Sequence, residues 1–159
     1  MADQNDLMQA KQVFDTLCQT LDGHDWEYEK DESKLTIECG AQGEDLPIQI
    51  TIRIDPKRHI AMLLSHMPFV ISEEKRLEMA VAISVVNNRL VDGSFDFDIS
   101  DGHMFFRMTT SFLESTIGSK VFTYMLYCSC KTVDEYNDKY LMLAKNMLTI
   151  EQFIGMVNH

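Results

Sequence analysis

The sequence has no apolar run long enough to cross a membrane and few basic residues for binding anionic partners. No part of its 159 residues approaches the roughly 20 consecutive apolar residues of a bilayer-spanning helix. Its 14 lysines and arginines are outnumbered by 25 aspartates and glutamates, so the net charge is -11. Such an acidic chain repels phosphate backbones and anionic lipid surfaces. We therefore expect neither nucleic acid nor a membrane as its partner.

Cysteine is scarce, and the four cysteines form no paired pattern. They lie at positions 18, 39, 128 and 130, which is typical of reduced thiols in a reducing compartment. The first residues also lack the basic region and the apolar core of a signal peptide. Both features predict a cytoplasmic protein.

The sequence contains none of the usual metal-binding or catalytic motifs. Cys128 and Cys130 would point about 200° apart on a helix, and the five histidines share no ligand spacing. Residues 96–102 superficially resemble a calcium-binding loop, but Arg107 stands where that loop needs a bidentate glutamate. Glycine-rich nucleotide loops and a GxSxG elbow are missing. We expect no metal, no cofactor and no enzymatic activity, although a carboxylate pair brought together by folding stays open as an alternative.

The first third of the chain predicts a helix followed by strands. Apolar residues spaced three and four apart predict a helix over residues 4–22, with Gly23 near its end. Apolar and polar residues then alternate over residues 26–39 and 48–54, as in a sheet with one buried face.

The next expected strand, residues 59–67 (HIAMLLSHM), is apolar at adjacent positions. One register leaves Leu63 on the outer face, and the other leaves Met62 and Leu64 there. A second layer, a second copy of the chain or another partner should cover that face. The candidate partner or dimer surface is therefore made of Met62, Leu63, Leu64 and Met67.

The middle of the chain predicts a buried helix and a tight hairpin. Ser72 should cap the helix, which Gly93 ends and which should be buried on most sides. A two-residue turn at 101–102 then predicts a hairpin in which residue 97 faces 106, 95 faces 108 and 96 faces 107.

The last third predicts helices. An apolar side runs from about residue 113 to 145, and Thr132 with Glu135 allows a break near Lys131. Thr149 with Gln152 predicts a final short helix over 149–157. The resulting order, α-β-β-β-(β)-α-β-β-α(-α), is an α+β pattern with an antiparallel sheet in one domain, residues 1–159, with a C-terminal helical extension from about 146.

Three stretches carry a family resemblance: residues 87–90 (NNRL), 93–107 (GSFDFDISDGHMFFR) and 134–136 (DEY). With the order of elements over roughly residues 7–145, they resemble the YbjN-like family, described as bacterial sensory transduction regulators. The resemblance implies a fold like that of type III secretion chaperones. It implies no catalytic residues, because the family has none assigned.

Two functional hypotheses follow from the sequence and the resemblance. The first is a non-enzymatic protein-interaction or regulatory domain that forms a homodimer and binds a protein partner not identified by the sequence. The second is a secretion-type chaperone that holds an extended effector segment across apolar patches. The 11 methionines suit adaptable apolar contacts of this kind, although they also fill gaps in ordinary cores.

Overall fold

The computed structural model describes residues 2–159 and contains the elements that the sequence predicts, in the predicted order. The elements are α1 (Gln4–Gly23), β1 (Tyr28–Asp31), β2 (Thr36–Gln42), β3 (Pro47–Asp55), β4 (Ile60–His66), the 3-10 turn η1 (Glu73–Lys75), α2 (Arg76–Asn87), β5 (Ser94–Phe97), β6 (Met104–Ser111), α3 (Ser119–Ala144) and α4 (Ile150–Val157).

All strands belong to one sheet of six, in the spatial order β1-β2-β3-β4-β6-β5. Every neighbouring pair is antiparallel. The first four strands follow one another as hairpins, and the chain then passes through α2 before β5 and β6 complete the sheet. The predicted α+β class with an antiparallel sheet is confirmed.

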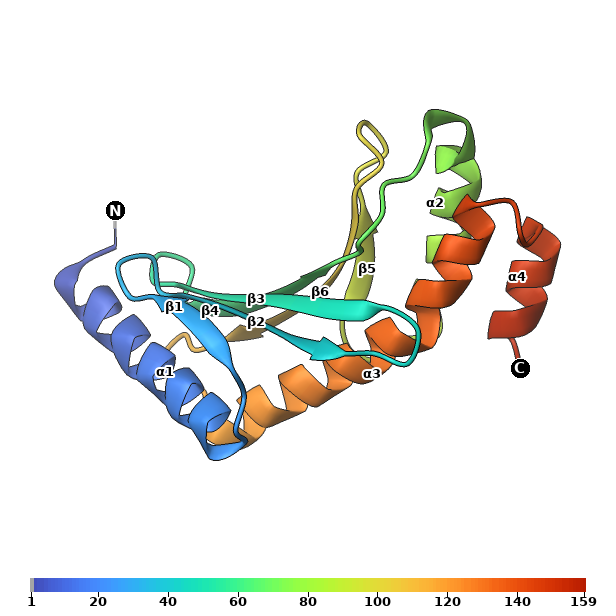
Figure 1. Cartoon of the computed structure of the whole chain (residues 1–159). Helices are drawn as coiled ribbons and strands as arrows, with labels where there is room; N and C mark the ends of the chain where they lie inside the picture. Colours follow the sequence, from blue (N-terminus) through green and yellow to red (C-terminus); the bar gives the residue numbers. More distant parts are fainter. Residues whose placement is uncertain (1) are drawn as a thin grey trace.

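The long helices cover one face of this sheet. Figure 1 shows α1 and α3 on the same side of the strands, while α2 and α4 lie at the end where β5 stands. The helices α1 and α3 contact each other, and both contact β3. Because side chains alternate along a strand, only every second residue of each strand faces these helices. We call the covered face of the sheet inner and the opposite face outer.

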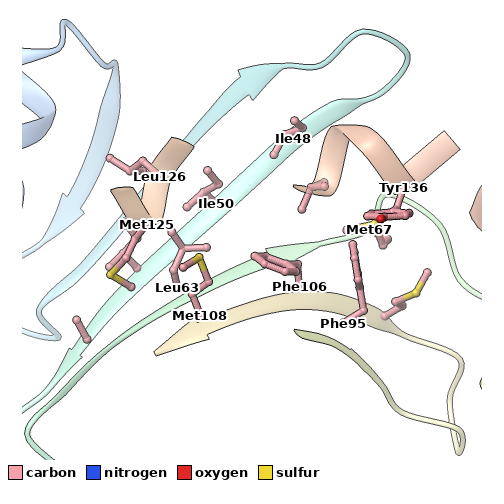
Figure 2. Close-up of a cluster of buried hydrophobic side chains, with 14 of the residues drawn as sticks. Ile48, Ile50, Leu63, Met67, Phe95, Phe106, Met108, Met125, Leu126 and Tyr136 are labelled. Atoms are coloured by element: carbon pink, nitrogen blue, oxygen red, sulfur yellow. The ribbon is translucent and has the colours of Figure 1, made fainter. Parts of the chain in front are cut away.

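The buried cluster between sheet and helices is rich in aromatic rings. The ring of Phe95 lies edge-on to those of Phe106 and Tyr140, with centroids 5.2 and 5.1 Å apart. Tyr140 in turn stacks on Phe153 of α4 at 5.4 Å. Figure 2 shows Phe95 beside Tyr136 of α3 at one end of the cluster, with Phe106 nearer its middle. This packing holds α4 against the domain, and the capping box of Thr149 and Gln152 confirms the predicted start of that helix.

The predicted hairpin exists, but its predicted register is wrong. Phe95, not residue 97, pairs with Phe106, and the connection spans residues 98–103. The Asp98 carboxylate accepts hydrogen bonds from the Ser100 backbone and hydroxyl, and Gly102 packs against Ile71, whose N–H donates to the Gly102 carbonyl at 2.9 Å. The bonds within the loop and the long-range contact with Ile71 together replace the two-residue turn that the Asp-Gly pair suggests.

The central helix is also less buried than the sequence predicts. Ser72 precedes the short 3-10 turn, and α2 itself begins only at Arg76. The residues Met79, Ala82, Ile83 and Val86 are buried, but Leu77 and Val81 are 75% and 51% exposed. The prediction of burial on most sides is therefore wrong, because the core takes up one side of the helix only.

The long helix α3 is continuous where the sequence allows a break. It runs from Ser119 to Ala144 through Lys131 without interruption. Buried residues recur along the whole helix, before and after this point, and include Leu126, Val133 and Tyr140. Packing against the core along the full length outweighs the local capping signal of Thr132 and Glu135.

Candidate protein-binding surface

The strand β4 resolves the two registers that its sequence allows. Leu63 is 0% exposed and faces the inner side, where Figure 2 shows it beside Met125 and Met108. Met67 follows the strand and is 6% exposed. Neither residue can contribute to an accessible partner surface, so this part of the predicted surface is wrong. Met62 and Leu64 occupy the outer face and are half-buried.

Every outward residue of β2, β3, β4 and β6 is at least partly exposed. Within residues 2–159, therefore, no helix covers the outer face of the sheet. Apolar residues gather at its centre. We call this set the apolar strip, and it consists of Ile60, Met62, Leu64 and Phe105. The ring of His66 extends the strip, since its centroid lies 5.3 Å from that of Phe105.

Polar residues surround the apolar strip on the neighbouring strands. Arg53 of β3 lies opposite Met62, while Thr51 of β3 and Arg107 of β6 flank Leu64 on its two sides. Arg107 pairs with Asp96 of β5 at 2.7 Å, although the two residues are diagonal neighbours and not directly opposite as the sequence predicts. An apolar centre surrounded by a polar rim is the usual arrangement of residues in a protein-binding surface.

A second feature of the outer face is an open hollow over β1, β2 and β3, with a volume of about 670 Å³. We call it the acidic hollow, and it is lined by Glu27, Tyr28, Glu29, Glu38, Cys39, Gly40, Gln49, Ile50 and Thr51. A side chain at Gly40 would have no room, since a Cβ there would lie 2.8 Å from the Ile48 carbonyl oxygen. The sequence does not predict this hollow, because its lining residues come from separate stretches that only the pairing of β1, β2 and β3 brings together.

The two edges of the sheet differ. At the β5 edge, the side-chain amide of Asn87 takes the place of a neighbouring strand: it donates to the Phe95 carbonyl at 2.9 Å and accepts from the Phe95 N–H at 2.8 Å. Asn87 belongs to the NNRL stretch at residues 87–90, and its structural role is to close the β5 edge of the sheet. At the other edge, β1 pairs with β2 alone.

Replacing Asn87 with alanine is expected to lower the free energy of unfolding by about 1–3 kcal/mol, because a part-buried strand edge then loses both partners. Chemical denaturation of the wild type and the variant measures this difference. The neighbouring Asn88 is exposed and its side chain makes no hydrogen bond within residues 2–159, so Asn88→Ala is the matched control. Equal losses in both variants would contradict the proposed closing of this edge.

Two of the four cysteines, Cys39 and Cys130, are poorly suited to nucleophilic chemistry. Burial raises the pKa of Cys39 to about 12 and that of Cys130 to about 11. The reactive thiolate is therefore hardly populated at neutral pH. Within residues 2–159, no group of three or more histidine, cysteine, aspartate or glutamate side chains is arranged to hold a metal ion. None of the described helices is long and apolar enough to cross a bilayer.

Comparison with solved structures places the fold among known proteins. One similar structure is "YbjN, a putative transcription regulator from E. coli", with a TM-score of 0.56 and 12% identity over 76% of this chain and 85% of that one. A second is the "ExsC-ExsE Complex", with a TM-score of 0.58 and 13% identity over 81% of this chain and 93% of that one. At these identities, both likenesses concern the fold alone.

Two sequence comparisons were informative, one with curated proteins and one with family patterns. No curated protein matches the chain. The sequence pattern of the family YbjN, described as "Putative bacterial sensory transduction regulator", matches residues 14–141, which confirms the resemblance seen in the sequence. The chain belongs to the YbjN family.

Proposed function

We propose that this chain is a non-enzymatic protein-binding domain with a regulatory role, and that a second copy of the chain binds to its apolar strip. One observation carries the proposal: the outer face of the sheet has no covering helix, yet its central strands present Met62, Leu64 and Phe105 side by side. Apolar surface of this kind gains free energy when another protein removes it from water. The family description supports the regulatory role.

A homodimer is the simplest occupant of this surface. The two copies would present the same strip to each other across a twofold axis, as in most symmetric dimers. Such a dimer would cover the apolar centre and leave the charged rim in water. Light scattering at tens of micromolar is expected to give twice the chain mass of 18.3 kDa. A monomer at that concentration would rule out the homodimer.

The proposed site can be tested inside cells by placing a photo-crosslinking amino acid at position 64. Irradiation is expected to produce a cross-linked species from this position, at twice the chain mass when the occupant is a second copy. The same amino acid at position 135, an exposed site on α3, is the control and should give no product. Absence of any product from position 64 would contradict the binding of a protein to the apolar strip.

A second candidate function is that of a chaperone that holds an extended segment of another protein. Its support is the likeness to ExsC, a protein of similar fold solved in complex with ExsE. In that case the product from position 64 would contain a different protein, and its mass would differ from that of the dimer. The mass of the product therefore decides between the two candidates.

A further inference from the structure

The acidic hollow has an excess of negative charge, and the basic side chain of Arg53 on the same face lies diagonal to Glu38, outside the lining of the hollow. Three glutamates line it, Glu27, Glu29 and Glu38, and no lysine or arginine does. None of the three forms an ion pair within residues 2–159. All three glutamate side chains are exposed to solvent, so they have no role in the packing of the core.

The two lysines closest to the hollow along the chain are already engaged. Lys30 pairs with Glu32 at 2.7 Å, and Lys34 pairs with Asp31 at 3.2 Å. Glu29 and Glu38 lie directly opposite each other on β1 and β2. Like charges in this position destabilise a sheet. The arrangement opposes folding, so a ligand that supplies positive charge would relieve it.

The hollow has room for the backbone of another chain. Gly40 has no side chain, and the hollow opens across β2 to the outward residues Gln49 and Thr51 of β3. On its other side lies β1, the strand at the open edge of the sheet. A second copy of this chain is a poor occupant, because it would bring the same glutamates to the same place.

We propose that the acidic hollow binds an extended segment of another protein that carries lysine or arginine at alternate positions. This inference rests on the proposed protein-binding function and names the chemistry of the partner. The hollow lies on β1–β3, beside the apolar strip of β4 and β6, and Thr51 borders both.

The spacing of the glutamates sets the spacing in the ligand. Glu27 and Glu29 are two positions apart and line the same hollow. An extended segment advances about 3.3 Å per residue, so its alternate side chains lie about 6.6 Å apart, which is the spacing expected between Glu29 of β1 and Glu27 just before that strand. Glu38, opposite Glu29, adds a second carboxylate to one of these positions. Arginine can bind such a carboxylate with two parallel hydrogen bonds.

The test uses the full chain and two labelled eight-residue peptides, one with arginine at three alternate positions and one with glutamate there. Fluorescence anisotropy at low salt is expected to show binding of the arginine peptide only. The double variant Glu29→Gln/Glu38→Gln should raise its Kd at least tenfold. The control variant Asp15→Asn/Glu135→Gln removes the same charge from exposed positions on α1 and α3 and should change Kd less than twofold. Equal Kd increases in the two variants would overturn the inference, since the net charge alone would then attract the peptide.

Two further readings separate failure of this inference from failure of the proposed function. The thermal midpoint of Glu29→Gln/Glu38→Gln should stay equal or rise, because the like-charge pair is removed. A lower midpoint would mean that the glutamates serve the fold and would overturn the inference. If the arginine peptide does not bind while position 64 still cross-links in cells, the inference fails and the protein-binding function stands. If position 64 gives no product while the peptide result holds, the apolar strip is not a binding surface and the acidic hollow alone binds a partner.

Discussion

Replacing Leu64 with lysine is expected to convert the proposed homodimer into a monomer at tens of micromolar. Leu64 lies at the centre of the apolar strip, between Thr51 and Arg107, and by symmetry the substitution appears twice in the interface. A lysine ammonium without a partner is costly to remove from water. We expect the dissociation constant to rise at least about 100-fold, which corresponds to roughly 2.8 kcal/mol. Sedimentation velocity over a concentration series measures this change.

The fold should survive this substitution, so that the effect on assembly can be read separately. Leu64 is only half-buried, and a lysine can lay its aliphatic stem along the strip while its charge reaches water. Gln42→Lys is the matched control, because Gln42 is an exposed residue of β2 away from the strip. The control should remain a dimer. A dimer that persists in Leu64→Lys would contradict the placement of the interface on β4, and the exposed residues Leu77 and Val81 of α2 would become the surface to test.

Replacing Phe95 with alanine is expected to reduce the free energy of unfolding by about 3–5 kcal/mol, which is the usual cost of removing a fully buried ring. Phe95 is 1% exposed and contacts the rings of Phe106, Tyr136 and Tyr140. Its loss removes contacts between β5, β6 and α3 at once. A total stability of 5–15 kcal/mol is ordinary for a domain, so the variant would lose a large part of it.

Denaturant unfolding followed by circular dichroism measures this loss, and two controls show its origin. Phe95→Leu keeps much of the apolar volume and should lose clearly less. Phe105→Ala removes a ring of the same size from the outer face, where Phe105 is only half-buried, and should cost less than Phe95→Ala in the monomer. Similar losses at positions 95 and 105 would contradict the assignment of inner and outer faces.

Regular alternation was the feature that made much of the fold predictable. In β3, Ile48, Ile50, Ile52 and Ile54 all face the core, as their spacing indicates. The capping box at Thr149 marked the start of α4 correctly, and the apolar spacing of α1 marked its length. These signals are local, since each depends on residues within one turn of helix or one strand, and that is why they can be read without knowing the rest of the structure.

The hairpin and the central helix were mispredicted where local and long-range contacts disagree. The Asp-Gly pair at 101–102 favours a two-residue turn, but the Asp98 carboxylate and the packing of Gly102 on Ile71 stabilise a longer loop. The apolar residues of α2 suggest burial all round, but Leu77 and Val81 face away from the core. Composition tells which residues prefer burial and not how much surface the fold can cover.

The sequence by itself determined the α+β fold class, the order of the helices and strands, the acidic character of the protein and the family to which it belongs. Only the tertiary structure decided that Leu63 faces the core and Leu64 the outer face, because a strand of adjacent apolar residues fits either register until its neighbours are placed. The acidic hollow likewise exists only after pairing, since it forms where β1, β2 and β3 bring Glu29 and Glu38 together from separate stretches of the chain.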